Sequence, residues 1–148
     1  MNLDLDMKFE KALDDICANC RYDVKFNTNR NEGLPLFEEF KSYNTETWSK
    51  IANDKGFIKQ FESYLQEVNK IEDLAYVINS NKANINEVKQ AFKELFKNKK
   101  DELFEIILKN NTLKNNLLGE GLTKSEAKNV FGDLINSTNS VLYNFIKF

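Results

Sequence analysis

Two cysteines have the spacing that thiol chemistry requires. Cys17 and Cys20 form a C-x-x-C motif, which redox enzymes use and which supplies half of many zinc sites. The chain has no histidine and no other cysteine, so a four-ligand zinc site would need carboxylates or a second subunit. The motif also lies near the end of an apolar helical stripe, and no predicted strand leads into it. We therefore predict core thiols of a reducing compartment, and the alternatives are a metal site shared between subunits or a redox switch.

General acid–base chemistry is restricted by the composition. Without histidine the chain lacks the most common general base near neutral pH, and with it the Ser-His and Cys-His nucleophile pairs. The carboxylate pairs that remain are Asp14–Asp15 and Glu38–Glu39, and adjacent acids on a helix point in different directions. We predict that both pairs are solvated surface, the second at the positive end of a helix that Pro35 opens. There is no G-x-G-x-x-G motif, P-loop or EF-hand loop. We therefore expect a protein that is not an enzyme, with no catalytic residue, cofactor or metal.

Four lysines predict a basic ridge along one helix. Lys89, Lys93, Lys97 and Lys100 recur at intervals of four, four and three, on the side opposite an apolar stripe. A ridge of this kind can bind phosphates through a salt-dependent attraction. It contains no arginine for contacts to base edges and no aromatic residue on which bases could stack. We favour an ordinary solvated face, ahead of an acidic protein partner and then nucleic acid.

The only tryptophan is a second candidate for partner binding. Trp48 follows a polar stretch in a short predicted helix, so it could anchor an interface while half exposed. Buried packing is the favoured alternative. The candidate partner-binding residues are therefore Lys89, Lys93, Lys97, Lys100 and Trp48.

The elements that would position these residues are predicted to be helices. Apolar residues recur at helical spacing in four segments, and capping signals at Asn84 and at Thr123–Glu126 support two of them. The segments are residues 4–22, 57–69, 85–98 and 124–147. A short helix is predicted from Pro35 to Tyr43, a helical continuation over residues 71–79, and a helix buried on most sides over Leu103–Leu108.

These elements predict an all-α fold, a single irregular bundle of about five to seven helices in one domain over residues 1–148. The twelve phenylalanines indicate a core of bulky rings. The net charge of −2 creates no long-range field toward nucleic acid or an anionic membrane. We expect no signal peptide and no membrane span, and hence a cytoplasmic location. The heavy use of Asn, Lys and Ile suggests an AT-rich bacterial or phage genome.

The function that these features favour is that of a non-enzymatic binding or regulatory protein. It would act through protein–protein contacts, as small helical inhibitors, immunity proteins and adaptors do. The alternative is a nucleic-acid-associated protein that uses the lysine ridge on the helix at about 85–98. A third hypothesis is an enzyme or metal protein that uses Cys17 and Cys20. The sequence leaves the oligomeric state open.

Overall fold

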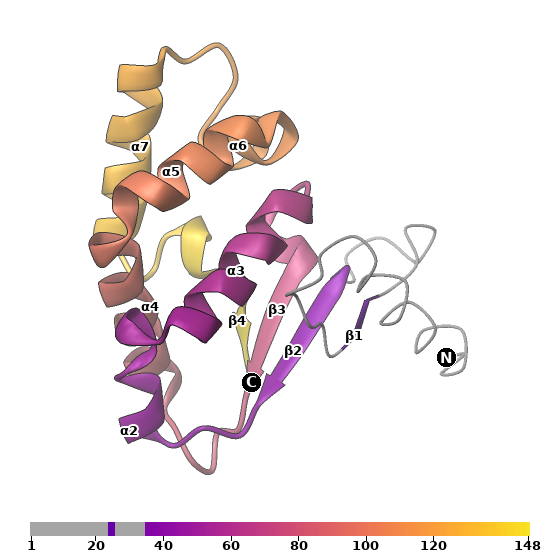
Figure 1. Cartoon of the computed structure of the whole chain (residues 1–148), viewed down its shortest axis with the longest axis vertical. Helices are drawn as coiled ribbons and strands as arrows, with labels where there is room; N and C mark the ends of the chain where they lie inside the picture. Colours follow the sequence, from indigo (N-terminus) through magenta and orange to yellow (C-terminus); the bar gives the residue numbers. More distant parts are fainter. Residues whose placement is uncertain (1–23, 26–34) are drawn as a thin grey trace.

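The chain combines helices with a small sheet (Figure 1). The computed structural model describes residues 24–25 and 35–148, and within them no helix is long and apolar enough to cross a membrane. The helices are α2 (Thr45–Trp48), α3 (Lys55–Glu67), α4 (Ile85–Asn98), α5 (Lys100–Lys109), α6 (Asn111–Leu117) and α7 (Lys124–Asn136). The strands are β1 (Val24–Lys25), β2 (Phe37–Lys41), β3 (Leu74–Ile78) and β4 (Ile146–Lys147).

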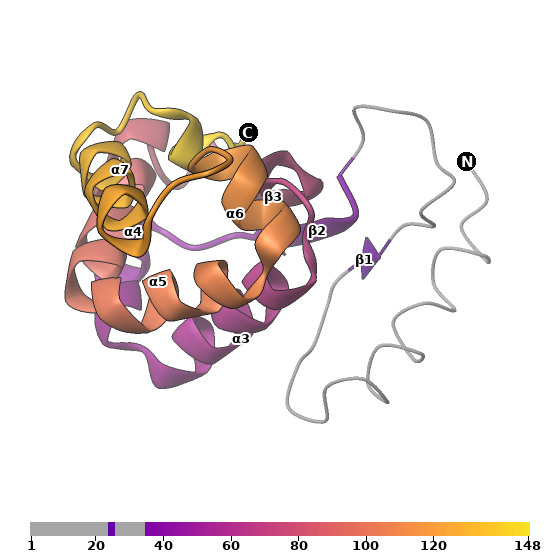
Figure 2. The ribbon, with the colours of Figure 1, turned by 90° about the horizontal axis from the view of Figure 1, so that it is seen from above.

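The sheet has the order β1-β2-β3-β4, with β1 antiparallel to β2 and the other three strands parallel. Parallel neighbours need crossover connections. Helices α2 and α3 connect β2 to β3, and α4 to α7 connect β3 to β4. Both crossovers lie on the same side of the sheet (Figure 2). The described helices therefore cover one face of β2, β3 and β4, and the opposite face carries the groove described below.

The core between sheet and helices is built from aromatic rings, as the phenylalanine content predicts. Phe92 of α4 lies at its centre, with its ring centroid 4.8 Å from that of Phe145 and 5.4 Å from those of Phe61 and Tyr76. All four side chains are fully buried. Helices α3 and α4 thus pack on the sheet through edge-on and tilted ring contacts, which contribute beyond simple area burial.

The prediction of a mostly helical chain is confirmed, but the prediction of a purely all-α fold is wrong. The helix predicted from Pro35 to Tyr43 is instead strand β2, and the helical continuation predicted over 71–79 is largely strand β3. Both are five-residue runs, and a run this short does not distinguish a period of 3.6 from a period of 2. In β3 nearly every side chain is buried, so the alternation that marks a strand is absent.

The longer helices match their predictions. Helix α3 corresponds to the predicted 57–69, α4 coincides with 85–98, and the buried helix at Leu103–Leu108 lies within α5. The capping box of Thr123 and Glu126 starts α7, but α7 ends at Asn136 and the rest of the predicted 124–147 forms a turn and β4. The polar stretch after Asn136 ends the helix. The predicted helix over 4–22 lies outside the described residues.

Asn110 joins two helices with one side chain. Its Nδ2 donates to the carbonyl oxygens of Leu65 and Val68 at the end of α3, at 2.8 and 2.7 Å. Its Oδ1 accepts from the Leu113 backbone N–H as the N-cap of α6. We expect Asn110→Ala to lower the free energy of unfolding by about 2 kcal/mol, since it removes a cap and leaves two carbonyls without this donor. Urea denaturation measures this, and Asn111→Ala, at the exposed neighbouring position, is the control. Equal losses for the two variants would contradict the role of Asn110.

A carboxylate between α3 and α5 gives a pH-dependent prediction. Burial and the nearby Glu102 raise the pKa of Glu62, while Lys99 opposes the shift. A raised carboxyl pKa means that the folded state disfavours the charged form, so stability is lost as the pH rises through the folded pKa. Glu62→Gln should therefore stabilise the chain at pH 7 by about a few tenths of a kcal/mol after solvent screening, and the gain should vanish near pH 3. Thermal unfolding at both pH values checks this, and a gain that persists at pH 3 would indicate a packing effect instead.

Candidate functional site

Glu39 is a buried carboxylate in the middle of β2. Its side chain is 2 % exposed, so the prediction that Glu38–Glu39 is solvated surface on a helix is wrong for Glu39. The cause is the strand: alternate side chains point to opposite faces, which directs Phe37, Glu39 and Lys41 toward α3 and Glu38 away from it. Carboxylates are almost never fully buried unless they are paired. The partners of Glu39 therefore decide what the site can do.

Within the described residues, the partners of Glu39 include a lysine and a tyrosine. The Lys41 Nζ lies 2.8 Å from the Glu39 Oε1, and the Tyr64 hydroxyl of α3 donates a hydrogen bond to Oε2. Tyr76 of β3 is the register partner of Glu39 in the sheet. Lys41 is 16 % exposed, and its Nζ lies 5.4 Å from the centre of the Tyr43 ring. The ion pair is thus buried at the carboxylate and reaches solvent at the ammonium.

This pair combines the two kinds of group that a phosphate-directed site needs. A carboxylate oxygen is a ligand for hard divalent cations, and an ammonium group attracts anions. Within residues 24–25 and 35–148, no group of three potential metal ligands is present. The other buried carboxylate of the described residues is Asp73. It accepts hydrogen bonds from the backbone N–H groups of Asn69 and Lys70, so its role is to stabilise the turn before β3. Of the two buried carboxylates in the described part of the chain, Glu39 is therefore the one that lies beside a cation.

The sequence signal that was missed is the E-x-K pattern of Glu39 and Lys41, which shares a face only if the segment is a strand.

The ion pair predicts a stability cycle. Lys41→Met removes the cation that lies 2.8 Å from the buried Glu39 carboxylate, and we expect the free energy of unfolding to fall by about 2 kcal/mol, below the usual range because Lys41 is partly exposed. The double variant Glu39→Gln/Lys41→Met removes both charges and should recover most of that loss. Guanidinium denaturation of the wild-type protein, the single variants Glu39→Gln and Lys41→Met, and the double variant measures the coupling between the two charges. Additive losses would show that the pair is not coupled.

The lysine ridge is not a continuous free surface. Lys93 Nζ donates to the carbonyl oxygen of Asn136 at the end of α7, at 3.0 Å. Lys100 begins α5 instead of continuing α4, and its Nζ lies 2.9 Å from the position a Cβ would take at Gly132 of α7. Lys89 is half-buried and Lys97 is exposed. Two of the four predicted lysines thus contact α7, which leaves Lys89 and Lys97 as the freer cations.

Trp48 is fully buried, so the structure shows the packing alternative and not an exposed anchor. Its ring contacts those of Tyr43, Phe57 and Phe92, with centroids 5.1, 6.1 and 5.8 Å away. Its Nε1 is buried with no hydrogen-bond partner in the described structure. Cys17 and Cys20 lie outside the described residues, so their predicted role as core thiols stays a prediction.

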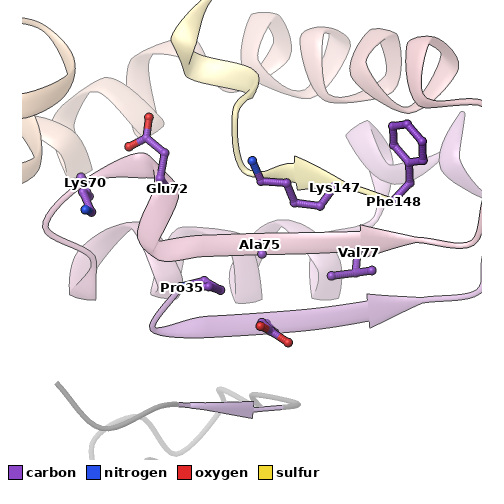
Figure 3. A pocket seen from close by; sticks show the side chains of 8 residues that line it. Pro35, Lys70, Glu72, Ala75, Val77, Lys147 and Phe148 are labelled. Carbon is purple, nitrogen blue, oxygen red and sulfur yellow. The ribbon is translucent and has the colours of Figure 1, made fainter. Parts of the chain in front are cut away.

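The face of the sheet that the described helices leave uncovered carries an open groove of about 540 Å³ (Figure 3). Its floor is Ala75 and Val77 of β3. Glu72, Lys147 and Phe148 line its β4 side, and Phe148 is 74 % exposed. The groove is on the opposite face of the sheet from the Glu39–Lys41 pair, because side chains alternate along each strand. The part of the chain that the structure describes therefore has two separate candidate sites.

Comparisons with protein-family models, with curated proteins and with solved structures find no match to this chain.

Proposed function

We propose that this chain hydrolyses phosphodiester bonds of nucleic acids with the help of Mg²⁺, at a site built on Glu39 and Lys41. The observation that carries the proposal is the buried carboxylate–ammonium pair on one face of β2. Burying such a pair costs more than packing apolar residues of the same size. An ion pair that is retained at this cost is a candidate for chemistry.

The donor chemistry supports Mg²⁺ and a phosphate substrate. Mg²⁺ binds through one or two carboxylates together with water and substrate phosphates, and so does not need a complete cage of protein ligands. Glu39 supplies one such carboxylate. The sequence has none of the glycine-rich loops that bind nucleotide phosphates, which favours a polymeric phosphodiester over a nucleotide. The lack of histidine is no obstacle, since a metal ion can activate water without an imidazole base.

The proposed roles are as follows. Glu39 would hold the cation, and a bound Mg²⁺ would supply a Lewis acid for a phosphate oxygen and for a water molecule. The ammonium of Lys41 neutralises charge on the phosphate and orients that water. The water oxygen forms a bond to phosphorus, the bond to the leaving oxygen breaks, and that oxygen takes up a proton, which gives a phosphate monoester and an alcohol. Tyr64 fixes the carboxylate through its hydrogen bond.

The test is a cleavage assay of the full chain on plasmid DNA, single-stranded DNA, duplex RNA and single-stranded RNA. We expect cleavage of at least one substrate with Mg²⁺ or Mn²⁺ and none with a chelator. Lack of cleavage of all four substrates across both metals, at protein concentrations up to about 10 μM, would contradict the proposal.

A second candidate function is protein binding, the function that the sequence favours. The observation in its support is the groove on a parallel sheet face that the described helices leave open, because parallel sheets are normally covered on both faces. Acetylation of lysines in a native lysate tests it: Lys147 in the groove should be protected relative to exposed Lys82, whereas equal labelling of both would contradict it.

A further inference from the structure

We propose that the Glu39–Lys41 site acts on a single strand of nucleic acid and stacks one base of that strand on Tyr43. The inference rests on the proposed hydrolysis of phosphodiester bonds and names the substrate class for that site. The observation that carries it is the position of Tyr43, in the segment between β2 and α2, beside the ammonium group of Lys41 (Figure 1).

Tyr43 is a partly exposed ring that a buried neighbour holds in place. It is half-buried, whereas Tyr64, Tyr76 and Tyr143 are fully buried. Its ring packs edge-on against the buried ring of Trp48, with centroids 5.1 Å apart. Trp48 therefore fixes the Tyr43 ring while part of that ring still reaches solvent. A fixed ring of this kind suits a nucleic-acid base, because every base has a π-face that can stack on an aromatic side chain.

Lys41 places a phosphate-binding group next to that ring. Its Nζ lies 5.4 Å from the centre of the Tyr43 ring and 2.8 Å from the Glu39 Oε1. An ammonium group has three donors, so it can contact a phosphate oxygen as well as the carboxylate. One nucleotide can thus place its phosphate on Lys41 and its base on Tyr43. This combination of a cation and an aromatic ring is typical of sites that bind single strands.

A duplex fits the same site poorly. Its bases are paired and stacked on one another, so a base must first leave the stack before it can reach Tyr43. Glu39 is only 2 % exposed, so the strand must bend inward to bring a phosphate to a cation held there. A duplex is stiff and bends at a cost, whereas a single strand is flexible. Duplex binding also depends on many phosphate contacts, and two of the four ridge lysines, Lys93 and Lys100, contact α7 instead.

A hairpin oligonucleotide tests the substrate class, because it offers paired and unpaired nucleotides in one molecule. The full chain is incubated with Mg²⁺ and end-labelled hairpins of DNA and of RNA, and each cut is mapped on a sequencing gel. We expect cleavage in the loop to be at least about tenfold faster than in the stem, because a paired base is not free to stack on the protein. The stem sequence as a separate unpaired strand controls for sequence preference. Equal rates in stem and loop would overturn the inference and leave the proposed hydrolysis standing.

Tyr43→Leu tests the stacking contact. The variant keeps an apolar side chain beside Trp48 but removes the ring, and we expect KM for the hairpin to rise about tenfold with little change in kcat. A folding defect would instead lower kcat. Tyr43→Phe keeps the ring and should restore the wild-type KM. Phe40→Leu makes the same kind of change on the opposite face of β2, at a side chain that is 54 % exposed, and should leave KM unchanged.

The other outcomes also decide the inference. An unchanged KM in Tyr43→Leu would overturn the stacking contact. If circular dichroism shows that this variant does not fold, a hairpin with abasic sites in its loop makes the same test on the wild-type chain, and its KM should rise about tenfold. No cleavage of the hairpins or of the four substrates named above would overturn the proposed function, and this inference with it.

Discussion

Glu39→Gln is expected to lower the rate of Mg²⁺-dependent phosphodiester cleavage by about 100-fold or more. The amide keeps the size of the side chain and a hydrogen bond to Tyr64, but it removes the negative charge that holds the cation. A metal ion stabilises the transition state by several kcal/mol, and each 1.4 kcal/mol is a factor of ten in rate. The measurement is initial cleavage rate at saturating Mg²⁺, with the folded state of each protein confirmed by circular dichroism.

Glu38→Gln is the matched control for this prediction. Glu38 is the adjacent residue of the same strand, with the same side chain, on the opposite face of the sheet. It should cleave within about threefold of the wild-type rate. Equal activity of the Glu38→Gln and Glu39→Gln proteins would remove Glu39 from the catalytic site.

Phe92→Ala is expected to cause the largest loss of stability, about 3–5 kcal/mol. The Phe92 ring is fully buried and contacts five other rings, those of Trp48, Phe57, Phe61, Tyr76 and Phe145. These rings come from α2, α3, β3 and the segment before β4, so no single element can move to fill the cavity. Because a domain has only about 5–15 kcal/mol of total stability, the variant should lose a large part of it.

Thermal unfolding measures the effect of Phe92→Ala, with an expected fall in Tm of about 10 °C or more. Phe40→Ala makes the same chemical change at a side chain that is 54 % exposed, and it should lower Tm by much less. Similar losses at the two positions would contradict the placement of Phe92 at the centre of the core.

The sequence correctly predicts those parts of the fold in which an apolar pattern repeats over many residues. Helix α4 repeats its apolar stripe over 14 residues and begins at an asparagine cap, so its bounds follow from the pattern alone. The strands are short, and nearly every side chain of β3 is buried, so the alternation of exposed and buried residues that marks a strand is absent there. Their assignment depends on pairing between segments far apart in the chain, such as Tyr76 with Ile146. Such pairing is a tertiary effect that one segment does not reveal.

The candidate site was missed for the same reason. Glu39 and Lys41 two residues apart would diverge on a helix, and the sequence pattern predicted a helix there. Once β2 is a strand, the two side chains share a face and form an ion pair. For Trp48 the residue type suggested a partner-binding role that the structure does not show. Its ring instead packs against those of Tyr43 and Phe57.

The most direct measurement of the central claim is the position of a bound metal ion. Crystals of the full chain soaked in Mn²⁺, measured at a wavelength where manganese scatters anomalously, show each bound ion as a peak. The proposal predicts a peak about 2.1 Å from a carboxylate oxygen of Glu39, the distance typical of octahedral sites of this kind, and its loss in Glu39→Gln crystals. Fully occupied Mn²⁺ elsewhere, with no ion at Glu39, would show that the buried pair serves the fold and not catalysis.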